Sequence, residues 1–203
     1  MKRTIWSMAF ILGTMITANA QETIRYYGHG LIQLKEGNEI KGVVKYSPQN
    51  PNNVWIQEDG KKWEKYKNKE VAAFKVEDKI FHSKVNKGAV ATNPNYFMEL
   101  LVPEDYKIKV YRYQEQSSLL VGGNYEVTTE YFVEFPEQDE VLGTGSMKLM
   151  PFHKKGVKYV ESCPDLVKKI SGKESGYKIG MISNDEMKAS VLIKVAEDYQ
   201  NCN

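Results

Sequence analysis

Residues 125–135 read YEVTTEYFVEF, and this stretch decides the fold class of the protein. Every second residue from Tyr125 to Phe135 is aromatic, Val or Thr. The residues between them are Glu or Thr, with the exception of Phe132. Successive side chains of a strand point to opposite faces of its sheet. The pattern therefore predicts a strand with one buried and one mostly hydrated face, which is typical of an antiparallel sheet.

Strand-like segments continue upstream of this stretch. They are predicted at residues 23–35, 40–46, 54–57, 63–66, 71–76, 79–85, 96–102 and 107–113. Hairpin turns are expected at three dipeptides between them, namely Gly37-Asn38, Asp59-Gly60 and Glu77-Asp78. The sequence thus predicts a β-rich region over residues 21–150. It forms either one antiparallel sheet or small barrel-like structure, or two small sheets at 21–85 and 96–150.

Downstream of Met150 the apolar period becomes helical. A first helix is expected over residues 152–162, weakened by Gly156. Cys163 and Pro164 end it, because a residue before proline avoids the α region. Pro164 suits the first position of a new, short helix. The predicted fold class is therefore α+β, with a β-rich N-terminal part followed by a helical C-terminal region at residues 151–203.

The last helix has a clear start signal. Ser183 is expected as its N-cap, with Glu186 as the capping-box partner. The apolar stripe that follows is expected to pack on the sheet or on a neighbouring helix. It consists of Val191, Leu192, Val195, Tyr199 and Cys202.

The first 20 residues have the three parts of a secretory signal peptide. Lys2 and Arg3 precede an apolar stretch at 5–16, and residues 18–20 (Ala-Asn-Ala) form a small-x-small cleavage pattern. The apolar stretch is shorter than the ~20 residues that span a bilayer, and no stop-transfer charge cluster follows it. We therefore expect residues 1–20 to be cleaved and the protein to be exported to the periplasm or the extracellular space. No transmembrane segment is expected after cleavage.

Composition excludes several classes of protein. The chain has 28 basic and 26 acidic residues, and loss of Lys2 and Arg3 leaves the mature protein formally neutral. A neutral chain has no global attraction for nucleic acid, so no nucleic-acid partner is expected. A hydrophobic content of 41% and an aromatic content of 11% suffice for a packed core, so we expect a folded chain apart from its termini.

Cys163 and Cys202 are the only cysteines. Exported compartments favour oxidation, and an antiparallel arrangement of the last helices brings these two helix ends together. We expect a structural disulfide, which would close a loop of roughly 40 residues and remove about 4 kcal/mol of denatured-state entropy. Two buried, unpaired thiols are the alternative. A redox role lacks a CxxC motif.

No motif for catalysis or cofactor binding is present. His29, His82 and His153 are not at metal-ligand spacing. The glycine-rich segments lack the phosphate-binding pattern, and no serine-nucleophile motif occurs. We therefore nominate no catalytic, cofactor-binding or metal-binding residue and no cofactor. The sequence favours a non-enzymatic protein and leaves the question of activity open.

The aromatic side chains are the one feature that indicates a ligand. Trp55, Trp63, Tyr111 and Tyr113 lie on predicted strands and are the candidate ligand-facing residues. Tyr111 and Tyr113 are expected on the lysine-bearing face of theirs. Flat amphipathic rings on a sheet surface stack on sugars or contact proteins. The alternative is cross-strand aromatic pairing that only stabilises the sheet.

Two further segments resemble a known group. Residues 30–42 read GLIQLKEGNEIKG, and the chain closes with CPDL at 163–166, Ile170 and YQNC at 199–202. These segments resemble the G-x-I-x-L-x-x-G-x-x-I-x-G opening and the ending of a group of uncharacterised exported bacterial proteins. The resemblance implies a β-rich N-terminal part, a helical C-terminal part and paired cysteines. The group has no assigned activity, so no catalytic or binding residue follows from it.

Three functions remain in order of preference. The first is a non-enzymatic binding or scaffold protein of the cell envelope, with an envelope protein or a glycan as partner. The second is a glycan-binding module with coplanar, exposed aromatic rings on one sheet face. The third is a hydrolase of unrecognised type, which requires a deep pocket with two carboxylates or a His–carboxylate pair.

Overall fold

The computed structural model describes residues 23–85, 95–118, 125–136, 141–143, 152–179 and 184–202. The predicted signal segment, residues 1–20, lies outside them. The described strands, in chain order, are β1 (Tyr26–Leu34), β2 (Glu39–Tyr46), β3 (Asn53–Gln57), β4 (Glu64–Lys67), β5 (Val71–Val76), β6 (Lys79–Val85), β7 (Asn95–Leu100), β8 (Lys109–Ser118), β9 (Tyr125–Glu134) and β10 (Leu142–Gly143).

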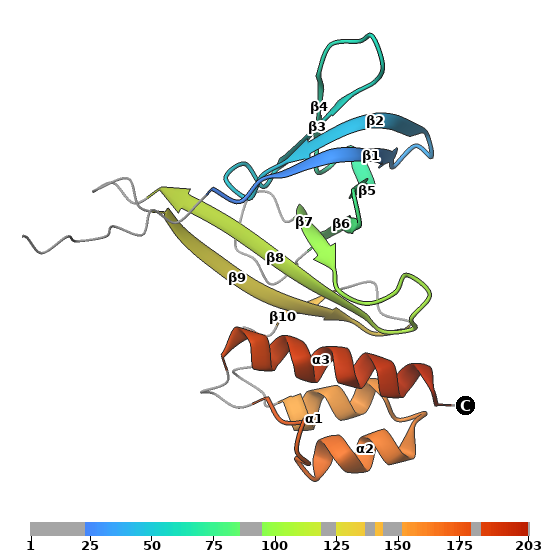
Figure 1. Ribbon diagram of the computed structural model, residues 1–203. Coiled ribbons are helices and arrows are strands. Elements are labelled where there is room, and N and C mark those ends of the chain that lie inside the picture. Colours follow the sequence, from blue (N-terminus) through green and yellow to red (C-terminus); the bar gives the residue numbers. More distant parts are fainter. Residues whose placement is uncertain are drawn as a thin grey trace, which may run out of the picture.

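These strands form one antiparallel sheet in the order β10-β9-β8-β7-β6-β5-β1-β2-β3-β4 (Figure 1). Pairing of β6 with β7 joins the strands before residue 85 to those after residue 95. The sheet curls, and helices follow it, so the α+β class predicted from the sequence is confirmed.

The three predicted hairpin turns are confirmed. Gly37 has a φ of +95° between β1 and β2, and Gly60 has a φ of +72° between β3 and β4. Glu77 turns the chain between β5 and β6 with a φ of +54°. Strand ends differ by a few residues from the prediction. β4 begins after Trp63, and β8 continues to Ser118 because it pairs along its whole length with β9.

Gly30 shows why the first strand is rich in glycine. It pairs with Gly42 on β2 and with Val76 on β5. A Cβ atom at Gly30 would lie 1.9 Å from the carbonyl oxygen of Lys75, far inside van der Waals contact. The missing side chain therefore lets the β5 backbone approach β1 closely, where the sheet curls.

A buried asparagine closes the curl. Asn68, which follows β4, is 1% exposed. Its amide donates to Asn52 Oδ1 (3.0 Å) and to the carbonyl oxygen of Asn95 at the start of β7 (2.6 Å). Its own carbonyl accepts a hydrogen bond from the Ser83 hydroxyl on β6 (2.6 Å). The end of β4 is thus tied to β6 and β7, so that the N-terminal half resembles a small barrel.

Two buried clusters form the core. The first fills the curled N-terminal half, where Tyr46, Phe74, Phe81 and Phe97 pack ring against ring. The second lies between the C-terminal half of the sheet and the helices. One sheet therefore supports two separately packed halves.

The helices are α1 (Phe152–Lys155), the 3₁₀ turn η2 (Gly156–Tyr159), α2 (Pro164–Ser171) and α3 (Asp185–Gln200). Helix α3 lies against β8 and β9, α1 and α2 lie on the side of α3 away from the sheet, and all three are remote from β1–β4 (Figure 1). The predicted break at Cys163 is confirmed, with Pro164 at the first position of α2. Gly156 ends α1 early, and the chain continues as a tighter turn.

The start of α3 corrects one prediction. Asn184, rather than Ser183, is the N-cap, and its side chain accepts a hydrogen bond from the Met187 amide (2.8 Å). Ser183 lies outside the described residues. Asparagine caps a helix as well as serine does, so two adjacent cap formers leave the start ambiguous in the sequence. Val191, Leu192 and Val195 of the predicted stripe are buried.

Cys163 and Cys202 come together as a disulfide with a Cα–Cα distance of 5.8 Å. The bond joins the N-terminus of α2 to the residue that follows α3 by two positions. Among the described residues, no helix has the length and apolar composition to cross a membrane.

Candidate functional site

Two of the four candidate aromatics are buried, which corrects the prediction for them. Tyr111 is 0% exposed and Tyr113 is 6% exposed. The Tyr111 hydroxyl donates to Glu134 Oε2 (2.7 Å), and the Tyr113 ring meets the Tyr96 ring edge-on at 4.8 Å. Burial raises the pKa of both hydroxyls above the ordinary value. Strand β8 lies inside the sheet and is covered on both faces, which a local alternation pattern does not reveal.

The other two candidates lie together on the outer face of β1–β4. Tyr27 pairs with Lys45, Lys45 with Trp55 and Trp55 with Lys65. Directly paired residues of neighbouring strands point to the same face, so these side chains form a row across four strands. Trp63, just before β4, joins them. We call Tyr27, Lys45, Trp55, Trp63 and Lys65 the aromatic–lysine face.

The rings of this face surround one ammonium group. Lys45 Nζ lies 5.5 Å from the Trp55 ring centroid and 5.1 Å from that of Trp63. The Tyr27 ring is 6.3 Å from the Trp63 ring. Tyr27 is 64% exposed and Trp63 37% exposed, while Trp55 is half-buried. The site therefore offers solvent both aromatic surface and a cation.

The rings are not coplanar, which corrects a second expectation. The planes of Tyr27 and Trp63 are inclined by 44°. Neighbouring strands of a sheet are rotated by roughly 20–25° relative to one another, so rings on successive strands turn with the sheet. The surface is twisted rather than a flat platform.

Sequence reasoning did not nominate Tyr27, although a signal for it exists. Ile32 on β1 is fully buried, so residues an even number of positions away share the inner face. Tyr27 falls on the opposite, outward face with His29 and Gln33, which are exposed. The parity of a single buried residue on β1 would have been enough to identify it.

The outer face of β1–β4 is predominantly basic. Its charged strand residues are one carboxylate and four lysines, namely Glu39, Lys41, Lys45, Lys65 and Lys67. Glu39 forms an ion pair with Lys41 (3.1 Å). Glu64 on β4 pairs with Ile56 and thus belongs to the inner face, where it accepts a hydrogen bond from the Tyr66 hydroxyl (2.7 Å). This face therefore carries a local positive field.

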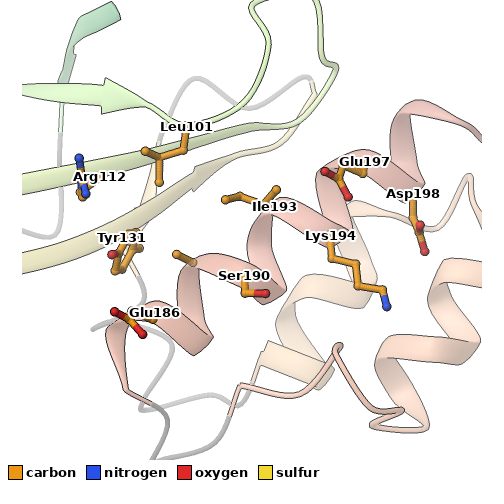
Figure 2. A pocket seen from close by; sticks show the side chains of 10 residues that line it. Leu101, Arg112, Tyr131, Glu186, Ser190, Ile193, Lys194, Glu197 and Asp198 are labelled. Atoms are coloured by element: carbon orange, nitrogen blue, oxygen red, sulfur yellow. The ribbon is translucent and has the colours of Figure 1, made fainter. Parts of the chain in front are cut away.

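A second feature is an open groove of about 670 Å³ between α3 and the sheet. Figure 2 shows Leu101, Arg112 and Tyr131 on the sheet side and the other labelled side chains on α3. Asp198 at one end accepts hydrogen bonds from Lys169 (2.8 Å) and the Tyr177 hydroxyl (2.5 Å). Burial raises its pKa, but these two bonds outweigh burial and hold it below the ordinary value. This carboxylate ties α2 and the loop after it to α3.

Arg112 at the sheet side of the groove is held by a buried carboxylate. Glu99 is 5% exposed. Its Oε1 accepts from Lys79 Nζ (2.7 Å), and its Oε2 accepts from Arg112 Nη2 (2.5 Å) and Nε (3.2 Å). The cluster joins β6, β7 and β8. Of the acidic and basic side chains in the groove, Arg112 is engaged by Glu99 and Asp198 by Lys169 and Tyr177, whereas Glu186 and Glu197 are exposed.

A His–carboxylate pair lies outside this groove. His82 Nε2 is 3.9 Å from Glu104 Oε1, and its Nδ1 is 3.4 Å from the Tyr111 hydroxyl. Burial, followed by the Lys84 charge, lowers the pKa of His82. Tyr111 points to the opposite face of β8 from Arg112, so this pair does not line the groove. Among the described residues, no group of three His, Cys, Asp or Glu is placed to hold a metal ion.

No protein-family model, curated protein or solved structure matches this chain. Among the described residues, the aromatic–lysine face is the most distinctive arrangement of exposed side chains.

Proposed function

We propose that this protein is an exported, non-enzymatic module that binds a polysaccharide chain through the aromatic–lysine face. The observation that supports this function is the cluster of three aromatic side chains on one outward sheet face, two of them well exposed. Pyranose rings present C–H faces that pack against aromatic rings, and their hydroxyls remain free for polar neighbours.

The shape of the face indicates what kind of chain fits. Rings inclined by 44° contact successive sugars only if those sugars turn relative to one another. A single, soluble chain has this freedom, whereas a chain in a crystalline array is held flat. We therefore expect binding to soluble polysaccharide and none to crystalline cellulose.

The site lies apart from the features that stabilise the C-terminal half. The disulfide and the helices belong to the half built on β8 and β9, whereas the aromatic–lysine face is on β1–β4 (Figure 1). None of the described helices covers this face, which leaves it accessible to a long ligand such as a polysaccharide. Export is supported by the N-terminal sequence and by the cysteine pair.

The test is a fluorescence titration of the purified protein. Of its three tryptophans, Trp6 lies in the predicted signal segment, so in mature protein Trp55 and Trp63 alone report on the face. The probes are hyaluronan, polygalacturonate and dextran, with affinity electrophoresis as an independent readout. Saturable binding to at least one probe is expected. Tyr27→Ala should weaken it about tenfold, or about 1.4 kcal/mol.

Matched variants separate binding from general damage. Trp63→Ala removes a ring of the face that is 37% exposed, whereas Met187→Ala removes a more exposed side chain, at 55%, from α3. The first should weaken binding measured by electrophoresis and the second should not. The proposal is overturned if none of the three probes binds, or if both variants bind as the parent protein does. Either result returns the face to a protein-contact or structural role.

A further inference from the structure

Aromatic and basic side chains alternate along one row of the aromatic–lysine face, and this alternation indicates how charge is spaced along the ligand. We infer, building on the proposed polysaccharide binding, that the bound chain is acidic and bears a carboxylate on every second sugar. The row reads Tyr27, Lys45, Trp55, Lys65 across β1, β2, β3 and β4.

The spacing of the row follows from sheet geometry. Neighbouring strands lie about 4.8 Å apart, so residues two strands apart along the row are separated by about 10 Å at the backbone. Lys45 and Lys65 are related in this way, and so are Tyr27 and Trp55. This distance is close to the length of a disaccharide unit. A chain that crosses the strands thus meets a ring and a cation once in each disaccharide.

The two lysines are free to bind an anion. Lys41 and Lys79 each form an ion pair, with Glu39 (3.1 Å) and Glu99 (2.7 Å) respectively. Within the described residues, neither Lys45 nor Lys65 has a carboxylate partner, and both are exposed. Lys45 is instead positioned by the Trp55 and Trp63 rings.

The held position of Lys45 favours an anion over a neutral sugar. Two rings fix the ammonium group beside the surface on which a sugar would stack, so little side-chain freedom is lost when a carboxylate binds it. Lys65, on the far side of Trp55, offers the second contact one disaccharide away. Carboxylates on adjacent sugars would place every other charge opposite an aromatic ring, where an anion is unfavourable.

The experiment compares three probes on the purified protein at low and high salt. Hyaluronan carries a carboxylate on every second sugar, polygalacturonate carries one on every sugar, and carboxyl-reduced hyaluronan keeps the backbone without the charge. Hyaluronan is expected to bind most tightly, and its binding should weaken as salt is raised.

Single lysine variants provide the matched controls. An exposed charge pair contributes up to about 1 kcal/mol, so Lys45→Gln and Lys65→Gln should each weaken hyaluronan binding by up to about fivefold. Binding of the carboxyl-reduced probe should not change. Lys41→Gln, on the same face but already paired with Glu39, should leave both affinities unaltered.

The outcomes distinguish this inference from the proposed function. If carboxyl-reduced and native hyaluronan bind equally and Trp63→Ala weakens both, polysaccharide binding stands and the acidic ligand is refuted. If polygalacturonate binds as tightly as hyaluronan, the alternating pattern is refuted. If dextran alone binds, the function stands and the inference fails; if neither dextran nor any of these three probes binds, both fail.

Discussion

Replacing Gly30 with alanine tests the account of the curled sheet most directly. The new Cβ atom would lie 1.9 Å from the Lys75 carbonyl oxygen and 2.8 Å from its carbon, and ordinary contact begins near 3.4 Å. The β5 backbone would therefore have to move away by about 1.5 Å, which exceeds the range over which a backbone hydrogen bond survives.

The expected cost follows from what this movement breaks. Two or more ladder bonds between β1 and β5 would be lost at about 0.5–1.5 kcal/mol each. Ile32, Phe74 and Val76, which are buried on these strands, would lose packing as well. We expect Gly30→Ala to lower the free energy of unfolding by about 4 kcal/mol or more, a loss of the size that substitutions disrupting a protein core produce.

Gly37 supplies the matched control for this substitution. It has a φ of +95°, but a Cβ there would meet nothing within 4 Å. Gly37→Ala should therefore cost only the left-handed backbone strain, about 1–2 kcal/mol. Urea unfolding monitored by circular dichroism gives the free energy of unfolding of both variants, provided that the dependence of this free energy on urea concentration is the same for each. A loss for Gly30→Ala no larger than that for Gly37→Ala would refute the close approach of β5 to β1.

Three further substitutions have separate outcomes. Cys163→Ser with Cys202→Ser should lower the free energy of unfolding by up to about 4 kcal/mol under oxidising conditions and by nothing under reducing ones, measured in urea; equal losses in both would contradict the cross-link. Glu99→Gln should lower the free energy of unfolding by about 2–3 kcal/mol, which is less than the loss of a fully buried ion pair because Arg112 regains some water. A double-mutant cycle with Arg112→Met should show a coupling energy well above that of a surface ion pair. The pKa of His82 is lowered by folding, so the unfolded chain binds the proton more readily, and stability should rise as pH increases through the ordinary histidine pKa. His82→Gln should flatten this rise between pH 5 and 7, and an unchanged slope would exclude His82 as its source.

The sequence predicts those parts of the fold that depend on neighbours along the chain. Turns at Gly37 and Gly60 follow from residues that tolerate positive φ, and the break before Pro164 follows from its ring. Each of these signals acts within a few residues. For the same reason the exact N-cap of α3 was missed, because Ser183 and Asn184 are both good cap formers at adjacent positions.

What the sequence does not predict depends on contacts between distant residues. Tyr111 lies on the face of β8 that the alternating sequence pattern predicts to be hydrated. It is nevertheless buried, because side chains of other strands cover that face. Asn68 and Glu99 are both ordinary surface residues by type. Their burial requires partners on other strands, such as Asn95 for Asn68 and Lys79 for Glu99. Parity along β1 was sufficient to identify Tyr27, but only once Ile32 was known to be inside.

The aromatic rings of the aromatic–lysine face contribute less to folding stability than those of the core do. Tyr46 and Phe74 are packed among other rings and stabilise the curled half by burial. Tyr27, at 64% exposed, gains little from folding, and its contact with Trp63 at 6.3 Å replaces only part of the water around either ring. A purely structural outer face would be served as well by threonine or lysine, which hydrate readily. Exposed aromatic surface gathered in one place is typical of a contact site, and an ammonium group held between two rings of that surface would favour a partner of negative charge.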